Sequence, residues 1–244
     1  MATLGADMSQ PGPADTAGEF SARLAGLQEV ADAASPSGAG TIPMRQVFDL
    51  AKQFFGLPLP DIERLLDVPD HLTRVGAVSI MDFKARRRST DQQQRRGLYE
   101  LYLRRHDRID TWDLVDRAAP HVVGGYLWDK PRDPLYELAA SPHWWERRTA
   151  IVATWFFIRQ DDLKDTFRLA DILADDPADL VQKAVGGWVR EAGKRDPIRL
   201  SAYLDRHAAT MPRTTLRYAV EHLSPELRSD YLGMKGTQSQ SARP

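Results

Sequence analysis

Apolar residues recur at three- and four-residue spacing along most of the chain, between about residues 44 and 234. This spacing places them on one face of an α-helix and predicts a series of helices of about 8 to 18 residues. Strand signals are missing, because no segment alternates apolar and polar residues over a sustained stretch and no Asn-Gly hairpin turn occurs. The pattern therefore predicts an all-α protein.

A weak internal repeat accompanies these helices. A basic or polar residue precedes small residues in segments 74–78, 147–151 and 182–186, at intervals of 73 and 35 residues. The intervals correspond to two units and one unit of about 36 residues, close to the period of HEAT-like helical pairs. We predict a HEAT-like helical-pair repeat array (an α-solenoid) with one concave binding face, although irregular bundles show similar spacing.

The two ends of the chain differ from its body. Residues 1–42 are rich in Ala, Gly, Ser and Pro, and only the segment 20–34 is amphipathic enough for a transient helix. Such a segment buries too little apolar surface to offset the entropy of ordering it. We predict a disordered tail over 1–42, a repeat domain over 43–234 and a second disordered tail over 235–244.

The composition indicates the class of protein and excludes some kinds of chemistry. The 244 residues are 42% hydrophobic and 27% charged, as in ordinary globular proteins, and they include no cysteine, which excludes disulfides and thiolate chemistry. No apolar run approaches the roughly 20 residues of a membrane-spanning helix, and the N-terminus has no signal-peptide pattern. We expect a cytoplasmic monomer without membrane contact.

The formal net charge of −1 argues against nucleic-acid binding, but the charge is unevenly distributed. Nine basic residues against three acids lie in segment 84–108: Lys84, Arg86, Arg87, Arg88, Arg95, Arg96, Arg104, Arg105 and Arg108. A cluster of this kind can neutralise DNA phosphates even in a nearly neutral chain. A solvated helix face is the ordinary alternative, and the adjacent Arg pairs cannot all point one way.

Several separate motifs resemble the DNA alkylation repair family, the alkylpurine DNA glycosylases. The likeness runs in the right order and spacing through most of residues 44–232, in the segments 109–116, 119–124, 145–151, 182–186, 190–191 and 211–219. The resemblance implies a HEAT-like array that cradles double-stranded DNA and removes cationic N3- or N7-alkylated purines in base excision repair. The implied enzyme is a monofunctional N-glycosidic bond hydrolase.

Trp112 and Asp116 are four residues apart, so they share one helix face. Breaking an N-glycosidic bond builds oxocarbenium-like positive charge, which a carboxylate stabilises or meets with a positioned water. The resemblance makes Asp116 the essential carboxylate and Trp112 the aromatic platform. Outside this family, such a pair is usually a core anchor and a solvated acid. Asp113 is better explained as an acid in the first helical turn.

The resemblance also implies DNA-binding residues. Arg148 matches an arginine that meets DNA beside the lesion, where it would clamp a phosphate, with a surface ion pair as the alternative. Arg147 stays undecided. Lys183, Trp188 and Arg190 are further DNA-binding candidates. The family usually has a tryptophan at the position of Gly187, and here the tryptophan is one residue later, about 100 degrees around the helix.

No cofactor is expected. The six histidines lack metal-ligand spacing, and the chain has no Gly-rich phosphate loop or nucleophile motif, so neither a metal nor a nucleotide is predicted. Two alternatives to the glycosylase remain: a non-catalytic module that binds damaged or branched DNA, and a protein-interaction scaffold. The change at Gly187 favours the first alternative, whereas Asp116 argues against the scaffold.

Overall fold

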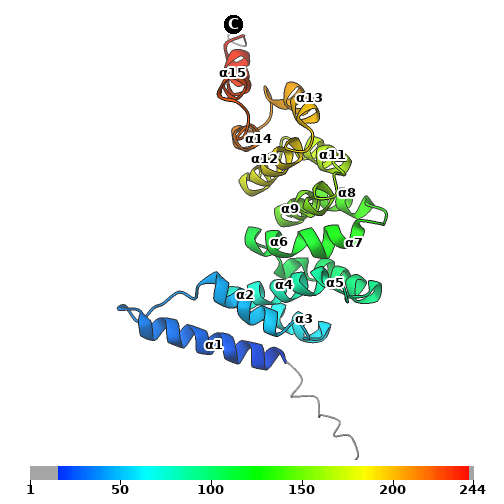
Figure 1. Cartoon of the computed structure of the whole chain (residues 1–244). Coiled ribbons are helices and arrows are strands. Elements are labelled where there is room, and N and C mark those ends of the chain that lie inside the picture. Colours follow the sequence, from blue (N-terminus) through cyan, green and yellow to red (C-terminus); the bar gives the residue numbers. More distant parts are fainter. Residues whose placement is uncertain (1–15, 242–244) are drawn as a thin grey trace, which may run out of the picture. The chain divides into compact units, whose positions relative to one another are not determined.

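A computed structural model describes residues 16–241 of the chain and the side chains of residues 16–234. Every regular element in this range is a helix, which confirms the all-α prediction (Figure 1). The chain divides into two compact units, residues 1–80 and 81–244. Helix α4, His71–Arg86, contains the boundary between them.

The first unit holds α1 (Ala17–Ala34), α2 (Met44–Gln53), α3 (Leu59–Asp67) and the first part of α4. Helix α1 packs on α2 and α3 through its apolar face. Phe20 on this face is fully buried, and its ring meets the edge of Phe54 at a centroid distance of 5.3 Å. A Cβ atom on Gly76 would lie 2.2 Å from the Phe20 ring, so only glycine lets the ring approach the α4 backbone this closely.

The predicted disorder of residues 1–42 does not hold for residues 17–34, which form α1. Two local features stabilise this helix. Thr16 accepts a hydrogen bond from the Glu19 amide at 3.1 Å, as an N-cap does. The segment after α1 also folds back onto it, because Asp32 accepts from the Gly40 amide and Gln28 donates to the Gly40 carbonyl, both at 2.8 Å. Residues 1–15 lie outside the described residues.

The second unit contains the remaining helices, most of them short. They are α5 (Gln92–Arg104), the 3-10 helix η1 (His106–Arg108), α6 (Trp112–Ala118), the π-helical segment η2 (Ala119–Gly124), α7 (Gly125–Leu127), α8 (Asp133–Ala139), α9 (Trp144–Ala153), α10 (Trp155–Ile158), α11 (Lys164–Ile172), α12 (Asp179–Gly193), α13 (Pro197–His207), α14 (Arg213–Ala219) and α15 (Pro225–Ser241). Helix α15 continues through most of the predicted C-terminal tail, and residues 242–244 lie outside the described residues.

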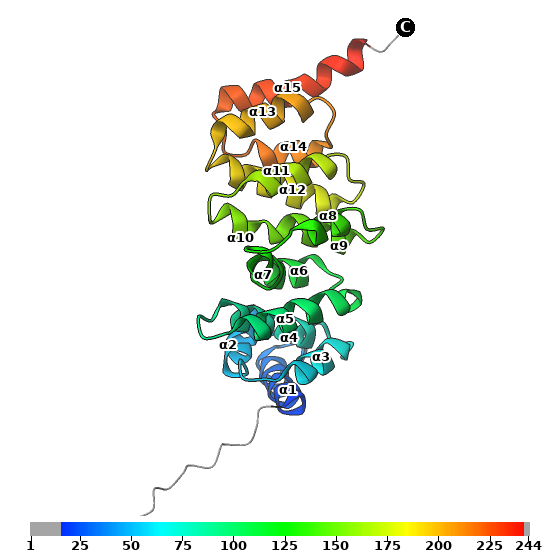
Figure 2. The same ribbon diagram turned by 90° about the vertical axis from the view of Figure 1, so that its right-hand side faces the viewer.

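Helices of the second unit pair and stack in chain order (Figure 2). Helices α6, α9, α12 and α14 form one row, in which each helix packs against the next. Helices α8, α11 and α13 back this row, as α8 packs on α9, and α11 and α13 pack on α12. The row carries three of the candidate site residues, Asp116, Arg148 and Lys183, on three successive helices.

The turn from α6 into η2 follows from the sequence. Pro120 stands near the start of η2 and has no amide hydrogen, so the α-helical hydrogen-bond ladder cannot pass through it unchanged. The backbone takes π-helical geometry over Ala119–Gly124. A Cβ atom on Gly124 would lie 2.0 Å from the Ala153 carbonyl oxygen, so glycine is required where η2 meets the end of α9.

No helix within the described residues is long and apolar enough to cross a membrane.

Candidate functional site

An ion pair between α6 and α9 lies at the centre of the site. Arg148 donates from Nε and Nη2 to the two carboxylate oxygens of Asp116, at 2.9 and 2.7 Å. Its third nitrogen, Nη1, donates to the Leu180 carbonyl oxygen on α12. The Arg148 side chain is only 6% exposed and that of Asp116 is 29% exposed. One buried guanidinium thus joins three helices, and the carboxylate that it holds stays partly exposed.

The charge balance at Asp116 reflects two opposing effects. Burial raises the pKa of Asp116 above the ordinary aspartate value of 3.8. The hydrogen bonds and the positive charge of Arg148 lower this pKa in return, and nearby Asp113 raises it slightly. Without the guanidinium, only the effects that favour the protonated form would remain. Arg148 therefore keeps Asp116 available as an anion.

Trp112 lies one helical turn before Asp116, at the start of α6. Its side chain is 52% exposed, which is unusual for an indole and leaves a large aromatic surface in contact with solvent. Asp113 follows in the first helical turn, where it accepts a 2.6 Å hydrogen bond from Thr111. An exposed indole and a half-open carboxylate on one short helix suit a ligand with a positively charged centre.

A buried polar network supports the ion pair from α5 and η1. The Thr149 hydroxyl, next to Arg148 on α9, lies 3.1 Å from the Tyr102 hydroxyl and 3.0 Å from Nε2 of His106. Burial lowers the pKa of His106 to about 4, so its imidazole is neutral near pH 7. These residues were not predicted from the sequence. A threonine inside the apolar run of α9 is the only signal that pointed to them.

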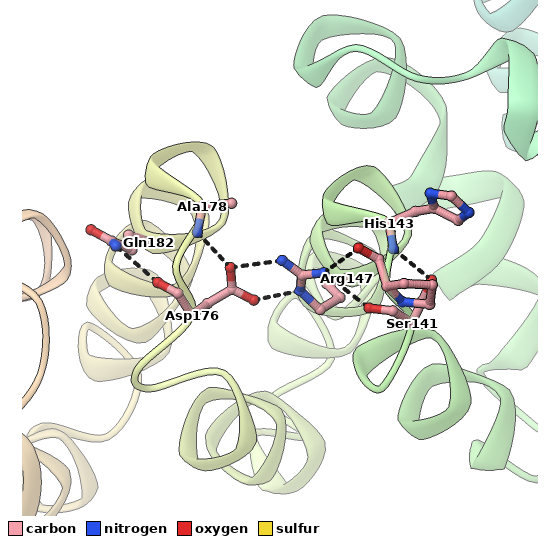
Figure 3. Close-up of polar contacts among 7 residues, drawn as sticks. Ser141, His143, Arg147, Asp176, Ala178 and Gln182 are labelled. Carbon is pink, nitrogen blue, oxygen red and sulfur yellow. Dashed lines mark hydrogen bonds and ion pairs between the residues drawn. The ribbon is translucent and has the colours of Figure 1, made fainter.

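Arg147 turns away from Asp116. Its guanidinium forms a bidentate pair with Asp176, at 2.6 and 3.1 Å, and also donates to the carbonyls of Ser141 and Pro142 (Figure 3). Asp176 in turn accepts from the Ala178 amide at 2.9 Å, just before α12 begins. Arg147, left open by the sequence, therefore ties the start of α9 to the start of α12.

The basic segment 84–108 is largely engaged within the protein. Arg95 donates to backbone carbonyls of Ala85, Arg87 and Thr90 and so caps the end of α4. Arg96 pairs with Glu100 at 2.7 Å, and Arg86 pairs with the buried Asp82 at 2.9 Å. These three arginines therefore have partners within the protein, and contact of the segment with DNA stays a prediction.

The sequence matches the family model of the DNA alkylation repair enzymes over residues 39–223, which is more than half of the chain. The chain belongs to this family. Membership gives it a role in the repair of alkylated DNA and places it among enzymes. A comparison with curated proteins gives no match.

The remaining DNA-binding candidates lie on α12, beyond the ion pair. Lys183 pairs with Asp179 at 2.7 Å, one turn earlier on the helix. Arg190 pairs with Glu221 and also contacts Glu191 at 3.1 Å. The Trp188 indole donates to the Val152 carbonyl at 3.1 Å and meets Trp155 edge-on. Lys183 is three residues after Leu180, whose carbonyl oxygen accepts from Arg148, whereas Trp188 packs against the end of α9.

Gly187 differs from its neighbour Gly186. Gly187 is buried, and a Cβ atom on it would have no other atom within 4 Å. The resemblance predicts a tryptophan at this place. Within the described residues, no group of three or more His, Asp or Glu side chains is placed to hold a metal ion.

Proposed function

We propose that the protein is a monofunctional DNA glycosylase that excises cationic N3- and N7-alkylated purines from double-stranded DNA in base excision repair. The observation that carries the proposal is the Asp116 carboxylate, which Arg148 holds through two hydrogen bonds and which stays 29% exposed, one helical turn after the exposed Trp112. Family membership gives the coarser role in alkylation repair, and this geometry supports the finer one.

Cleavage of this C–N bond requires few catalytic groups from the protein. An alkylated purine already carries a positive charge and leaves readily, so the C–N bond breaks with the bonding electrons moving onto the base. Positive charge then builds on the sugar. In the proposal, the Asp116 anion stabilises that charge or positions the water that adds to the anomeric carbon. The face of the Trp112 indole adds an attractive interaction with the same charge.

Arg148 acts on this chemistry through Asp116. Its side chain is almost fully buried, and its Nε, Nη1 and Nη2 atoms all donate to protein oxygens. In the proposal, Arg148 is a positioning residue that fixes the direction and the ionised state of the carboxylate. This role differs from the phosphate clamp expected from the sequence, and the two roles make different predictions for a variant.

Asp116→Asn tests the function directly. We expect it to lower the rate of base release by about 100-fold or more, because a neutral amide cannot stabilise the developing charge. The assay measures release of 3-methyladenine and 7-methylguanine from methylated duplex DNA. Asp161→Asn is the matched control, because Asp161 is exposed and adopts a positive φ angle of 58° that asparagine tolerates well. Wild-type activity in Asp116→Asn would remove the assignment.

The second candidate is a module that binds damaged DNA without cleaving it, and the glycine at position 187, where the family usually has a tryptophan, favours it. Salt-dependent duplex affinity without base release would support this candidate. Gly187→Trp would then be the informative variant, since an added side chain meets no atom within 4 Å of its Cβ. A gain of base release in Gly187→Trp would show that the missing indole limits the activity.

A further inference from the structure

A second feature of the row lies beyond the ion pair, where α12, α14 and α15 meet. A cavity of about 440 Å³ opens there, lined by Lys183, Thr214, Arg217, Tyr218, Glu221 and Arg228. Three of these side chains are cations and one is an acid. We call this cavity the basic groove. Its lining is mostly polar and charged, unlike the apolar pockets that bind drug-sized ligands.

The charges in the basic groove are not equally neutralised. Glu221 is paired with Arg190, which lies outside the lining. Lys183 is paired with Asp179, an exposed contact that also raises the pKa of the lysine. Neither Arg217 nor Arg228 forms an ion pair with any acid of the described residues. Two guanidinium groups thus face one cavity, and like charges so placed attract an anion.

The packing that creates the basic groove depends on Gly186. A Cβ atom on Gly186 would lie 2.4 Å from the Thr215 carbonyl oxygen and 2.6 Å from Cβ of Tyr218. Glycine therefore lets the backbones of α12 and α14 approach closely, which brings Arg217 and Tyr218 beside Lys183. The groove therefore depends on a specific close contact between α12 and α14.

The position of the basic groove relative to the ion pair suggests its ligand. Arg148 reaches α12 through the Leu180 carbonyl oxygen, and Lys183 is three residues further along the same helix. Residues 180 and 183 are about one turn apart on α12, so the groove begins about one helical turn from the contact that Arg148 makes. A nucleic-acid strand that presents a nucleotide to Asp116 would carry its next phosphates along this row toward the groove.

We propose that the basic groove binds backbone phosphates of the DNA strand at a distance from the reacting sugar, with Arg217 and Arg228 as the principal contacts. This inference rests on the proposed function, because it assumes that DNA lies along α6, α9, α12 and α14. A guanidinium offers paired donors that match the oxygens of a phosphodiester. Such contacts fix the register of the strand and carry no base information.

The test compares two double variants with the same change in charge. Arg217→Gln with Arg228→Gln removes the two groove cations, whereas Arg199→Gln with Arg206→Gln removes two exposed cations of α13 that pair with Asp196 and Asp171. The affinity for an undamaged duplex is measured by fluorescence anisotropy over a range of salt concentrations. Each lost phosphate contact flattens the logarithmic salt slope by about 0.9.

We expect the groove variant to lower the slope by about two contacts, or about 1.8, and the α13 variant to leave it unchanged. Equal slopes in the two variants would overturn the proposal, as would an unchanged slope in the groove variant. Competition with inorganic phosphate at constant ionic strength separates a strand from a free ion. Protection by phosphate in thermal unfolding, without any change in the DNA slope, would show a site for the free ion and also overturn the proposal.

The same samples keep this proposal separate from the glycosylase. If base release is lost in Asp116→Asn and the salt slope is unchanged in the groove variant, only the proposal that the basic groove binds phosphates is refuted. If the salt slope is flatter in the groove variant and the wild-type protein releases no base, the glycosylase proposal is refuted and the phosphate-binding proposal stands. Circular dichroism melting of both double variants shows that the compared proteins are folded.

Discussion

Replacing Arg148 by glutamine separates a positioning role from a phosphate-binding role. The change removes both hydrogen bonds to Asp116, at 2.9 and 2.7 Å, and the donor to Leu180 on α12. The carboxylate then stays half-buried without its cation. We expect three consequences together: lower stability, a higher pKa of Asp116, and a slower reaction at neutral pH and below.

The size of the stability loss follows from the burial of the pair. Removing one partner of a buried ion pair costs about 3 to 5 kcal/mol. Asp116 is 29% exposed, so water replaces part of the lost interaction, and we expect a loss of about 2 to 3 kcal/mol. For a protein of this size, that corresponds to a fall in melting temperature of about 4 to 12 °C.

The pH dependence has a definite sign. The raised pKa of Asp116 means that the folded protein holds this proton more tightly than the unfolded chain does. Stability from this group therefore falls as the pH rises from the ordinary value of 3.8 through the raised value. Arg148→Gln should raise the pKa further, because burial is then unopposed. Its stability deficit should be largest near pH 7 and shrink as the pH falls and the carboxyl protonates.

The decisive assay is a double-mutant cycle with Asp116→Asn. Urea unfolding of the two single variants and the double variant gives the coupling energy between the side chains, which we expect to be about 1 to 3 kcal/mol. The acid limb of single-turnover base release should also move to higher pH in Arg148→Gln. Additive stability losses would refute the positioning role. So would an unmoved acid limb combined with a DNA salt slope that is flatter by about one contact.

Two further changes test the packing around the site. Phe20→Ala should destabilise the first unit by about 3 to 5 kcal/mol in urea unfolding, because α1 loses the fully buried ring that contacts Phe54. A loss of stability below about 1 kcal/mol would mean that α1 does not pack on this unit. Asp176→Asn should lower the melting temperature clearly, because the Arg147–Asp176 pair is nearly buried. The control is Arg195→Gln, which breaks an exposed pair with Asp161 and should change the free energy of unfolding by no more than about 0.5 kcal/mol. Equal losses of stability in Asp176→Asn and Arg195→Gln would contradict the structural role of Arg147.

Much of the helical content could be predicted from the period of the apolar residues, and the first 42 residues show where that signal fails. Composition predicted disorder there, because Ala, Gly, Ser and Pro dominate. Helix α1 nevertheless forms, because besides its local contacts it has a buried face on which Phe20 packs against Gly76 and Phe54, far along the chain. The local signal that was present is the pair Thr16 and Glu19, three residues apart, which is typical of a capped helix start.

The candidate site shows a different limit of sequence reasoning. Helical spacing correctly placed Trp112 and Asp116 on one helix, because that relation is local. The partners of Asp116 are not local: Arg148 lies 32 residues away. The Thr149 contacts with Tyr102 and His106 span 47 and 43 residues. A period identifies which face of a helix is buried, but it does not identify the helix that covers it. The family resemblance identified Arg148 as a candidate residue, and the structure shows that its partner is Asp116.

The two adjacent arginines of α9 show how one helix can serve two neighbours. Successive residues of an α-helix point about 100 degrees apart, so Arg147 and Arg148 cannot share a partner. Arg147 binds Asp176 before α12, and Arg148 binds Asp116 on α6 and the Leu180 carbonyl of α12. The position of the Asp116 carboxylate therefore depends on the register of α9 against both neighbours. Short helices bury little surface each, and in the proposed function these ion pairs hold the Asp116 carboxylate in the orientation that the reaction needs.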